Sequence, residues 1–388
     1  MKTNPWRIVA ALGLVIVGMG ILVLIVKNNN AGNRDFISYW AAGHQLVHGG
    51  NPYDGEAVWA LERSVGYNSD YHLIMRNPPA ALFLSLPLGF VSPNTGLVLW
   101  LVALLGSLVV SIRMLKGMLS RRADRLHLLG YCFAPLMICL MAGQFGIFLL
   151  LGTVLFLYFH RSRPLPAGAA LLLCASKPHL FLPFGIVLLV WVIFKKRYRI
   201  LAGFCAALLG SCVPLFFLDI HAWSQYAQMM RTGGALDEPV PVLSMIFRAL
   251  IDPRAVWLQF VPEGAACAWA LWYFWTRRNR WSWMNEGMVL LIVSALCRPF
   301  GWFSDEAMLL PAVLAGIYQA DDSGRSLLPF GIIGGAAILE VLVEIPMNTL
   351  FYVWSVPAWL GWYLYATRDN SKRTREAFCC AADTAEQL

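Results

Sequence analysis

Long apolar runs without a charged side chain constrain the fold of this chain more than any other feature. The first run, Ile8 to Val26, contains no charged residue and is long enough to cross a hydrocarbon core about 30 Å thick. Only 13% of the residues are charged, whereas soluble domains carry about 25%. The sequence therefore predicts an all-α polytopic membrane protein, with residues 1–388 forming a single integral-membrane domain.

The apolar runs and the breaks between them predict about twelve transmembrane crossings. The predicted crossings are 8–26, 78–112, 127–142, 145–159, 166–176, 178–194, 200–218, 255–275, 286–298, 306–319, 327–345 and 349–366. Several are shorter than about 17 residues, so we expect broken helices that neighbouring helices shield from lipid. Ser92-Pro93-Asn94 interrupts 78–112, which we expect to cross once with its first half re-entrant; two full crossings would invert everything downstream.

The net charge of +8 is interpreted as a topology signal and not as a nucleic-acid site, because most basic residues collect in short loops between apolar runs. Placing the N-terminus in the cytoplasm puts most of these residues inside. This orientation makes 27–77 an outer loop and 367–388 a cytoplasmic tail. The nine cysteines include no CxxC pair, so neither a disulfide framework nor a zinc site is predicted.

The outer loop is predicted to carry two juxtamembrane helices. Apolar residues recur at helical spacing from Phe36 to Val47, a glycine-rich turn follows, and a second amphipathic helix is expected at about 55–66. Asp35 falls in the first turn of the first helix. A carboxylate there either stabilises the helix N-terminus or acts as a general base.

The order of several short motifs resembles glycosyltransferase family 87, the polyprenyl-phosphate-mannose-dependent mannosyltransferases among the GT-C glycosyltransferases. In the outer loop and re-entry segment the matching residues are Asp35, Tyr39, Pro52-Tyr53-Asp54, Pro78-Pro79 and Pro87-Leu88. Downstream they are Gly143-Gln144 and Lys177-Pro178 with Pro183, and the stretch of Arg298-Pro299 with Trp302, Asp305 and Glu306 occupies the place of a polar outer loop in the family. The resemblance covers roughly residues 8–320, and the sequence departs from it at Asn77 and at the acidic pair Asp305-Glu306.

This resemblance implies a GT-C fold and an inverting transfer of a hexose, mannose above all, from polyprenyl phosphate to a lipid or glycan acceptor. The reaction would take place on the extracytoplasmic side of a bacterial cytoplasmic membrane, without a cofactor. Such a transfer needs a base for the acceptor hydroxyl and cations for the departing phosphate. Asp35 is the candidate base.

The remaining candidate residues divide into two sets. For the donor phosphate they are Lys177, Arg76, Arg298 and His179. For other substrate contacts they are Tyr39, Tyr53, Gln144, Trp302 and Asp305. Lys177 lies between two apolar segments, where a charge is costly unless it is paired or functional; snorkelling to the membrane surface is the alternative.

Two other classes of function remain open from the sequence. A transporter or flippase for lipid-linked saccharides would share the many helices, and a ligase or polymerase would use outer arginines without an Asp base. A metal site is not predicted. His44 and His48 have the spacing of a zinc pair, but no third ligand stands at a diagnostic distance in the sequence.

Overall fold

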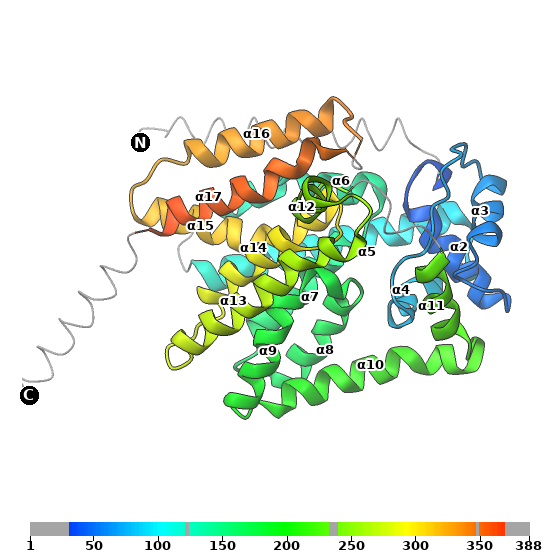
Figure 1. The fold of residues 1–388 in the computed structure, drawn as a ribbon, viewed down its shortest axis with the longest axis horizontal. Helices are drawn as coiled ribbons and strands as arrows, with labels where there is room; N and C mark the ends of the chain where they lie inside the picture. Colours follow the sequence, from blue (N-terminus) through cyan, green and yellow to red (C-terminus); the bar gives the residue numbers. More distant parts are fainter. Residues whose placement is uncertain (1–30, 121–123, 233–239, 347–348, 369–388) are drawn as a thin grey trace, which may run out of the picture.

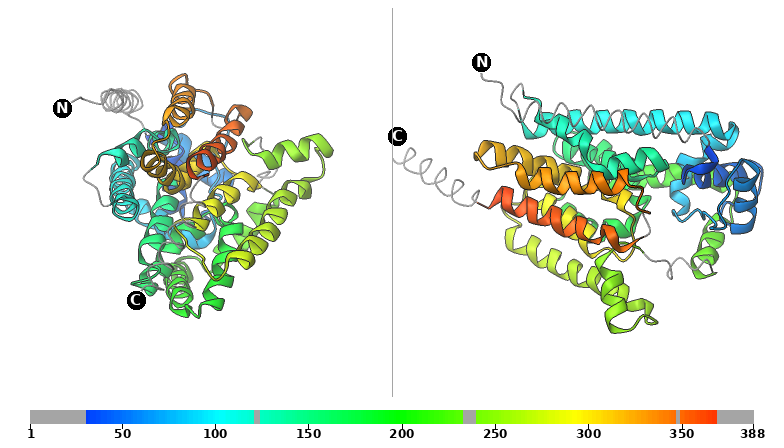
Figure 2. Two further views of the ribbon diagram at one scale, coloured as in Figure 1. Left: turned by 90° about the vertical axis from the view of Figure 1, so that its left-hand side faces the viewer. Right: turned by 90° about the horizontal axis from the view of Figure 1, so that it is seen from above.

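The computed structural model describes residues 31–120, 124–232, 240–346 and 349–368, and within these ranges the chain forms helices and no strands (Figure 1). The predicted first crossing, 8–26, lies outside the described residues. The helices form two groups. A small group lies at one end of the molecule, and a larger bundle makes up the rest (Figures 1 and 2).

The small group contains the outer-loop helices and two later segments. Its elements are η1 (Ala31–Asn33), α2 (Phe36–Val47), α3 (Gly55–Ser64), η2 (Pro79–Ala81), α4 (Leu82–Ser85), η3 (Leu86–Phe90) and α11 (Ala222–Thr232). Helices α2 and α3 coincide with the two predicted juxtamembrane helices. Asp54 accepts hydrogen bonds from the backbone N–H groups of Glu56 and Ala57 and so caps α3.

The bundle contains the long apolar helices and the 3₁₀ segments that lead into them. Its elements are α5 (Pro93–Leu119), η4 (Leu126–Cys132), α6 (Ala134–Ala142), α7 (Gly146–Phe159), α8 (Pro164–Ala175), η5 (Pro178–Leu180), α9 (Leu182–Phe194), α10 (Tyr198–Leu218), α12 (Leu243–Ile251), η6 (Val256–Phe260), α13 (Val261–Arg277), α14 (Glu286–Cys297), η7 (Phe303–Leu309), α15 (Leu310–Asp322), α16 (Leu328–Leu342), η8 (Leu350–Trp354) and α17 (Ser355–Thr367). Most predicted crossings coincide with one of these helices or with a 3₁₀ segment joined to a helix.

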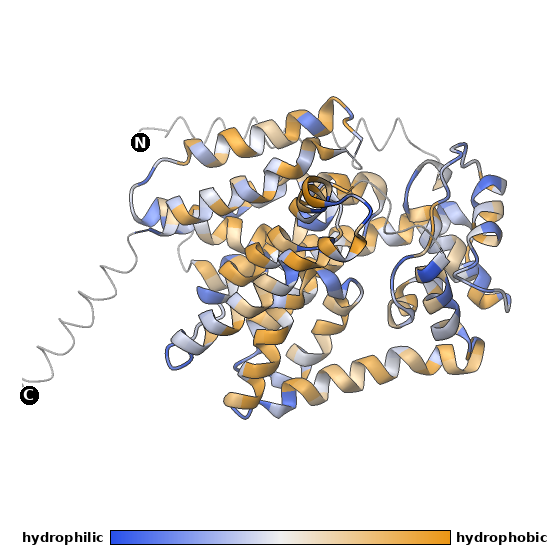
Figure 3. Cartoon of the chain, viewed as in Figure 1, coloured by the Kyte–Doolittle hydropathy of each residue, from blue (hydrophilic) through white to orange (hydrophobic). Residues whose placement is uncertain are grey.

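Two of the described helices, α5 and α10, are long and apolar enough to cross a membrane. Apolar side chains also face outward from the bundle, as Phe217 of α10 does with 79% of its surface exposed, and apolar residues predominate along the bundle helices in Figure 3. Polar residues concentrate in the connecting loops and on α3 and α11. The helical fold is therefore consistent with a membrane protein, and the number of crossings stays a prediction.

The segment 78–112 divides into two unequal parts. Pro79–Phe90 forms the short elements η2, α4 and η3, which at about 1.5 Å per residue are too short to span a bilayer as a helix. Helix α5 begins at Pro93, and the Ser92 hydroxyl accepts a hydrogen bond from the Thr95 N–H at 3.4 Å. This arrangement fits the single net crossing that the sequence predicts.

Backbone-to-backbone packing joins α2 to this re-entry segment. A Cβ atom on Gly43 would lie 2.1 Å from the carbonyl oxygen of Ser85, and one on Gly89 would lie 2.2 Å from the carbonyl oxygen of Gly43. Neither glycine accommodates a side chain without movement of a main chain. The helix that carries Asp35 is therefore held against η3 by close contact.

We predict that Gly43→Ala destabilises the fold, because the added methyl group overlaps backbone atoms that cannot rotate away. Overpacking of this kind costs about 1–3 kcal/mol, and thermal unfolding of the detergent-purified protein measures it. Gly106→Ala in α5 is the matched control, since nothing lies within 4 Å of its added Cβ. An equal melting temperature for Gly43→Ala and the wild type would contradict the packing argument.

Candidate active site

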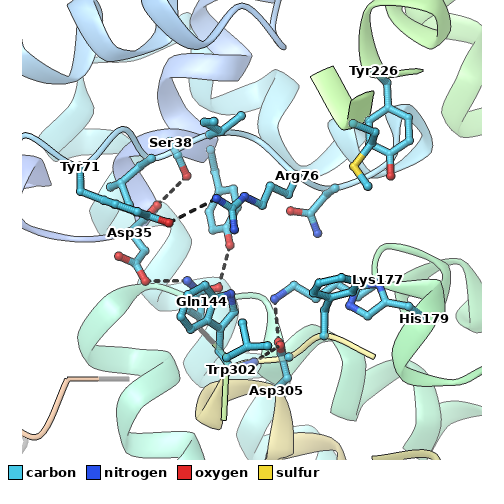
Figure 4. Close-up of a pocket in the computed structure, with 18 of the residues that line it drawn as sticks. Asp35, Ser38, Tyr71, Arg76, Gln144, Lys177, His179, Tyr226, Trp302 and Asp305 are labelled. Atoms are coloured by element: carbon cyan, nitrogen blue, oxygen red, sulfur yellow. Dashed lines mark hydrogen bonds and ion pairs between the residues drawn. The ribbon is translucent and has the colours of Figure 1, made fainter. Parts of the chain in front are cut away.

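A cavity of about 370 Å³ lies between the small helix group and the bundle. It is lined by Asp35, Ser38, Tyr39, Tyr67, Tyr71, Leu73, Ile74, Arg76, Asn77, Gln144, Lys177, His179, Tyr226, Met230, Val240, Phe300, Gly301, Trp302 and Asp305. Figure 4 shows Asp35 at the left of the cavity and Lys177 with Asp305 toward the lower right. Arg76 lies above the centre of the view, between Asp35 and Tyr226. The cavity therefore brings together charged groups from four separate parts of the chain.

The carboxylate of Asp35 does not cap its helix. Asp35 occupies the N-cap position of α2 with φ −58° and ψ −22°, and its side chain accepts no hydrogen bond from the helix backbone. Its Oδ2 instead accepts a hydrogen bond of 2.6 Å from Gln144 Nε2. Of the two explanations that the sequence leaves open for Asp35, the structure does not support capping.

Gln144 is oriented by a second partner. The Tyr39 hydroxyl donates to Gln144 Oε1 at 2.8 Å, so the amide must present its nitrogen, which carries the hydrogens, to Asp35. Tyr39 lies one helical turn after Asp35 on α2. The tyrosine, the amide and the carboxylate thus form one hydrogen-bonded chain that leads to the cavity.

The end of α6 explains why Gln144 reaches this position. Gly143 terminates α6 in the left-handed conformation with φ 72°, which favours glycine, and a Cβ there would lie 2.7 Å from Cβ of Phe36. Arg34 Nη1 donates to the carbonyl oxygens of Leu140 and Met141 at 3.1 and 2.7 Å. These bonds satisfy carbonyls that the helix end leaves open and hold α6 beside Asp35.

Burial governs the acidity of Asp35. It raises the pKa of the Asp35 carboxyl above its usual value, while the hydrogen bond from Gln144 and the positive charge of Lys177 oppose that effect. A carboxylate with a raised pKa is a stronger base than an exposed one. Asp35 is thus suited to accept a proton from a group in the cavity.

The strongest charge interaction in the cavity joins Lys177 to Asp305. Lys177 Nζ lies 2.6 Å from Asp305 Oδ1, and the two side chains are 11% and 1% exposed. Asp305 Oδ2 accepts a second hydrogen bond of 2.9 Å from the N–H of Trp302. Burial alone would raise the pKa of Asp305, but the Lys177 ammonium and these hydrogen bonds hold it below its usual value.

The other predicted residues that line the cavity come from breaks between helices. Lys177 follows the end of α8, and the Asn77 side chain donates to the carbonyl oxygen of Ser176 at 2.9 Å. Arg76 comes from the segment between α3 and η2, and its Nη2 donates to the Tyr71 hydroxyl at 3.2 Å. His179 and Trp302 also line the cavity.

Two predicted site residues do not line the cavity. Tyr53 is buried, its hydroxyl donates to the carbonyl oxygen of Asn77 at 2.9 Å, and its ring packs against Tyr226 at 5.3 Å. Arg298 is fully buried and pairs with Glu306 at 3.1 Å. Both residues therefore contact residues near the cavity but do not line it themselves. Their positions do not favour the direct substrate contact that the sequence predicts.

Several lining residues are absent from the sequence-based set. Tyr67 and Tyr71 come from an irregular polar segment after α3, and Tyr226 comes from α11. Asn77 was noted only as a departure from the family pattern. Aromatic residues in a polar outer segment were the available signal, but nothing local indicated that they face Asp35.

His44 and His48, the pair with the spacing of zinc ligands, lie together at the end of α2. The rings of His44 and His48 stack with centroids 4.0 Å apart. In the part of the chain that the structure describes, no three His, Cys, Asp or Glu side chains gather at distances suited to a metal ion.

Comparison with known proteins assigns the central part of the chain to a family. A sequence model of glycosyltransferase family 87 matches residues 76–299, which is more than half of the chain. The matched range includes Arg76, Gln144 and Lys177, and it excludes Asp35 and Asp305. No curated protein and no solved structure matches the chain significantly.

We predict that Asp35→Asn raises the melting temperature at neutral pH. The folded-state pKa of Asp35 is raised, so its contribution to stability is present below the unfolded pKa, near 3.8, and is lost as pH rises through the folded value. Asparagine keeps the acceptor for Gln144 and carries no charge, so the advantage of the variant should grow with pH and then level off.

Thermal unfolding of both proteins over a pH series measures this difference. Asp54→Asn is the control, because asparagine caps a helix as well as aspartate does and Asp54 caps α3. A lower melting temperature for Asp35→Asn at every pH would contradict this prediction, because it would show that the charged carboxylate stabilises the folded state.

Proposed function

Because the chain belongs to glycosyltransferase family 87, we propose that it transfers a hexose, most plausibly mannose, from polyprenyl phosphate to a lipid or glycan acceptor. The membership itself makes the protein a glycosyltransferase, which leaves the transporter interpretation without support. We also propose that the protein crosses the membrane several times and that the transfer takes place on the outer face of the membrane. Polyprenyl phosphate as the donor and mannose as the sugar are parts of the same proposal. The observation that carries the mechanism is a carboxylate, Asp35, in one cavity with the cations Lys177 and Arg76.

The proposed reaction is a single displacement. Asp35 accepts the proton of an acceptor hydroxyl while that oxygen attacks C1 of the donor sugar. The bond between C1 and the phosphate oxygen breaks, and its electron pair stays on the polyprenyl phosphate, so the configuration at C1 inverts. Gln144 and Tyr39 keep the carboxylate in place, which supports general-base catalysis because the base must lie within hydrogen-bond reach of the proton.

The departing phosphate gains negative charge as the bond to C1 breaks. Lys177 and Arg76 are proposed to stabilise that charge, since cations aimed at a charge that develops in the transition state lower the barrier. His179 lies beside Lys177 in the cavity lining and is proposed to contact the phosphate. No metal ion takes part in the proposal.

The remaining lining residues divide by polarity. Met230, Val240 and Phe300 contribute apolar side chains to the lining, which suit the first units of a prenyl chain. Trp302, Tyr39 and Gln144 offer a ring, a hydroxyl and an amide that suit the sugar. Exposed apolar residues of α10 and α11, Phe217 and Trp223 among them, support a position of this cavity at the edge of the bilayer.

We predict that Asp35→Asn lowers the rate of transfer by ~10²–10⁴ while donor binding is largely kept, because asparagine cannot take the proton. Membranes from cells that carry each variant as the sole copy are supplied with polyprenyl phosphate bearing tritium-labelled mannose, and label in lipid and glycan products is counted. Polyprenyl-phosphate glucose serves as the alternative donor.

Asp54→Asn is the matched control for that assay, because it makes the same chemical change in the same outer region at a residue that caps α3. It should transfer at close to the wild-type rate. An Asp35→Asn protein that also transfers at that rate would remove Asp35 as the base and would favour an arginine-dependent ligase.

We also predict that Lys177→Met raises the donor KM by about 10- to 100-fold, since a hydrogen bond to a charged group contributes about 1.5–3 kcal/mol. The single variant leaves Asp305 buried without its partner, so the double variant Lys177→Met/Asp305→Asn is measured beside it. If Lys177 contacts the phosphate, neutralising Asp305 does not restore the donor KM.

Lys195→Met is the control for Lys177→Met, because Lys195 is an exposed lysine at the end of α9. Its donor KM should equal that of the wild type. A wild-type donor KM for the Lys177/Asp305 double variant would show that the ammonium only balances the charge of Asp305.

A further inference from the structure

Arg298 lies behind the wall of the cavity. It follows α14 directly, none of its surface is exposed, and its Nη2 lies 3.1 Å from Glu306 Oε1 and 3.5 Å from the carbonyl oxygen of Trp302. A Cβ atom on Gly301 would lie 2.4 Å from Arg298 Nε. Because Gly301 and Trp302 line the cavity and contact Arg298, which does not line it, we infer that their backbone separates the guanidinium from the cavity.

Glu306 connects this arginine to a third helix. Its Oε2 accepts a hydrogen bond of 2.6 Å from the Ser355 hydroxyl, and both residues are fully buried. The carboxylate thus contacts the end of α14 through Arg298 and the start of α17 through Ser355, while it belongs to η7 itself. Within the described part of the chain, Arg298 supplies the charge that balances Glu306.

Asp305 is the residue immediately before Glu306 in η7. Its two oxygens bind the Trp302 N–H and the Lys177 ammonium, so the position of η7 determines where the ammonium lies. A buried ion pair that loses one partner leaves an uncompensated charge, and the structure around it rearranges or unfolds. A change at the Arg298–Glu306 pair is therefore transmitted to Lys177 through one turn of 3₁₀ helix.

We propose that Arg298 is a positioning residue: its ion pair with Glu306 fixes η7, and η7 places Lys177 for the donor phosphate through Asp305. The effect on the donor rests on the proposed function, whereas the effect on Lys177 does not. The competing explanation is a direct contact between Arg298 and the phosphate. Its Nε and Nη1 atoms have no hydrogen-bond partner among the described residues, so they are the atoms that such a contact would use. Because Gly301 packs against Nε, a substrate would have to displace Gly301 to reach it.

Comparison of a single variant with a double variant separates the two explanations. Arg298→Met leaves the buried Glu306 carboxyl without its ion-pair partner, so η7 should shift and the donor KM should rise by about tenfold or more. Arg298→Met/Glu306→Gln removes both charges and keeps an oxygen for the Ser355 hydroxyl, so positioning predicts a donor KM within about threefold of the wild type. A direct phosphate contact predicts that the double variant is as impaired as Arg298→Met.

A second measurement needs no sugar donor. The detergent-purified protein is treated with sulfo-N-hydroxysuccinimide acetate, and acetylation of Lys177 is followed by mass spectrometry. In Arg298→Met, the reagent should acetylate Lys177 several times faster than in the wild type, because Asp305 no longer holds the amine. In the double variant, the acetylation rate should return to that of the wild type. Arg280→Met, at an exposed arginine, should leave both measurements unchanged.

The outcomes are distinct. Restoration of the donor KM and the acetylation rate in the double variant supports positioning. A folded double variant with a raised donor KM overturns it, and this holds even if Arg298→Met alone does not fold. If the wild type transfers no sugar from polyprenyl phosphate, the proposed function fails, and the acetylation rates alone decide: an unchanged rate in folded Arg298→Met overturns the positioning role.

Discussion

The ion pair between Lys177 and Asp305 connects the break between α8 and α9 to η7, and the cavity is built around it. Both side chains are almost fully buried, and a buried charge costs several kcal/mol unless a partner and further hydrogen bonds compensate it. Asp305 meets this requirement with one oxygen on Lys177 and the other on the Trp302 backbone. The charged part of the site can therefore form only when segments from distant parts of the chain have packed together.

The same requirement acts at the helix ends around the cavity. Helices that end inside an apolar bundle leave carbonyl groups without partners, and polar side chains from other segments bind them. Arg34 binds the end of α6, and Asn77 binds the end of α8 at Ser176. These contacts keep the ends of α6 and α8 beside one cavity. The backbone breaks that follow these helices therefore position Gln144 and Lys177, although the same breaks weaken the individual helices.

Asp35 and Lys177 are held in different ways that suit different tasks. Asp35 receives a hydrogen bond from a neutral amide, which orients the carboxylate without neutralising it, so it can still accept a proton. Lys177 is held by the carboxylate of Asp305, a negative charge that balances its own positive charge. Behind it lies a second buried ion pair, Arg298–Glu306, so Lys177 and Arg298 are each balanced by a carboxylate.

The sequence alone determined the helical class, most helix positions, and the contacts that follow from helical periodicity. Asp35 and Tyr39 are four residues apart in the predicted outer helix, a spacing that brings two side chains to one face, and the break predicted between 127–142 and 145–159 contains Gly143, which ends α6. Only the tertiary structure decided that Gln144 donates to Asp35, that Asp305 pairs with Lys177, and that Arg298 lies behind Gly301. These contacts join residues 109 and 128 positions apart in the first two cases. Spacing along a helix specifies neighbours within a few residues, whereas such distant contacts depend on how whole helices pack.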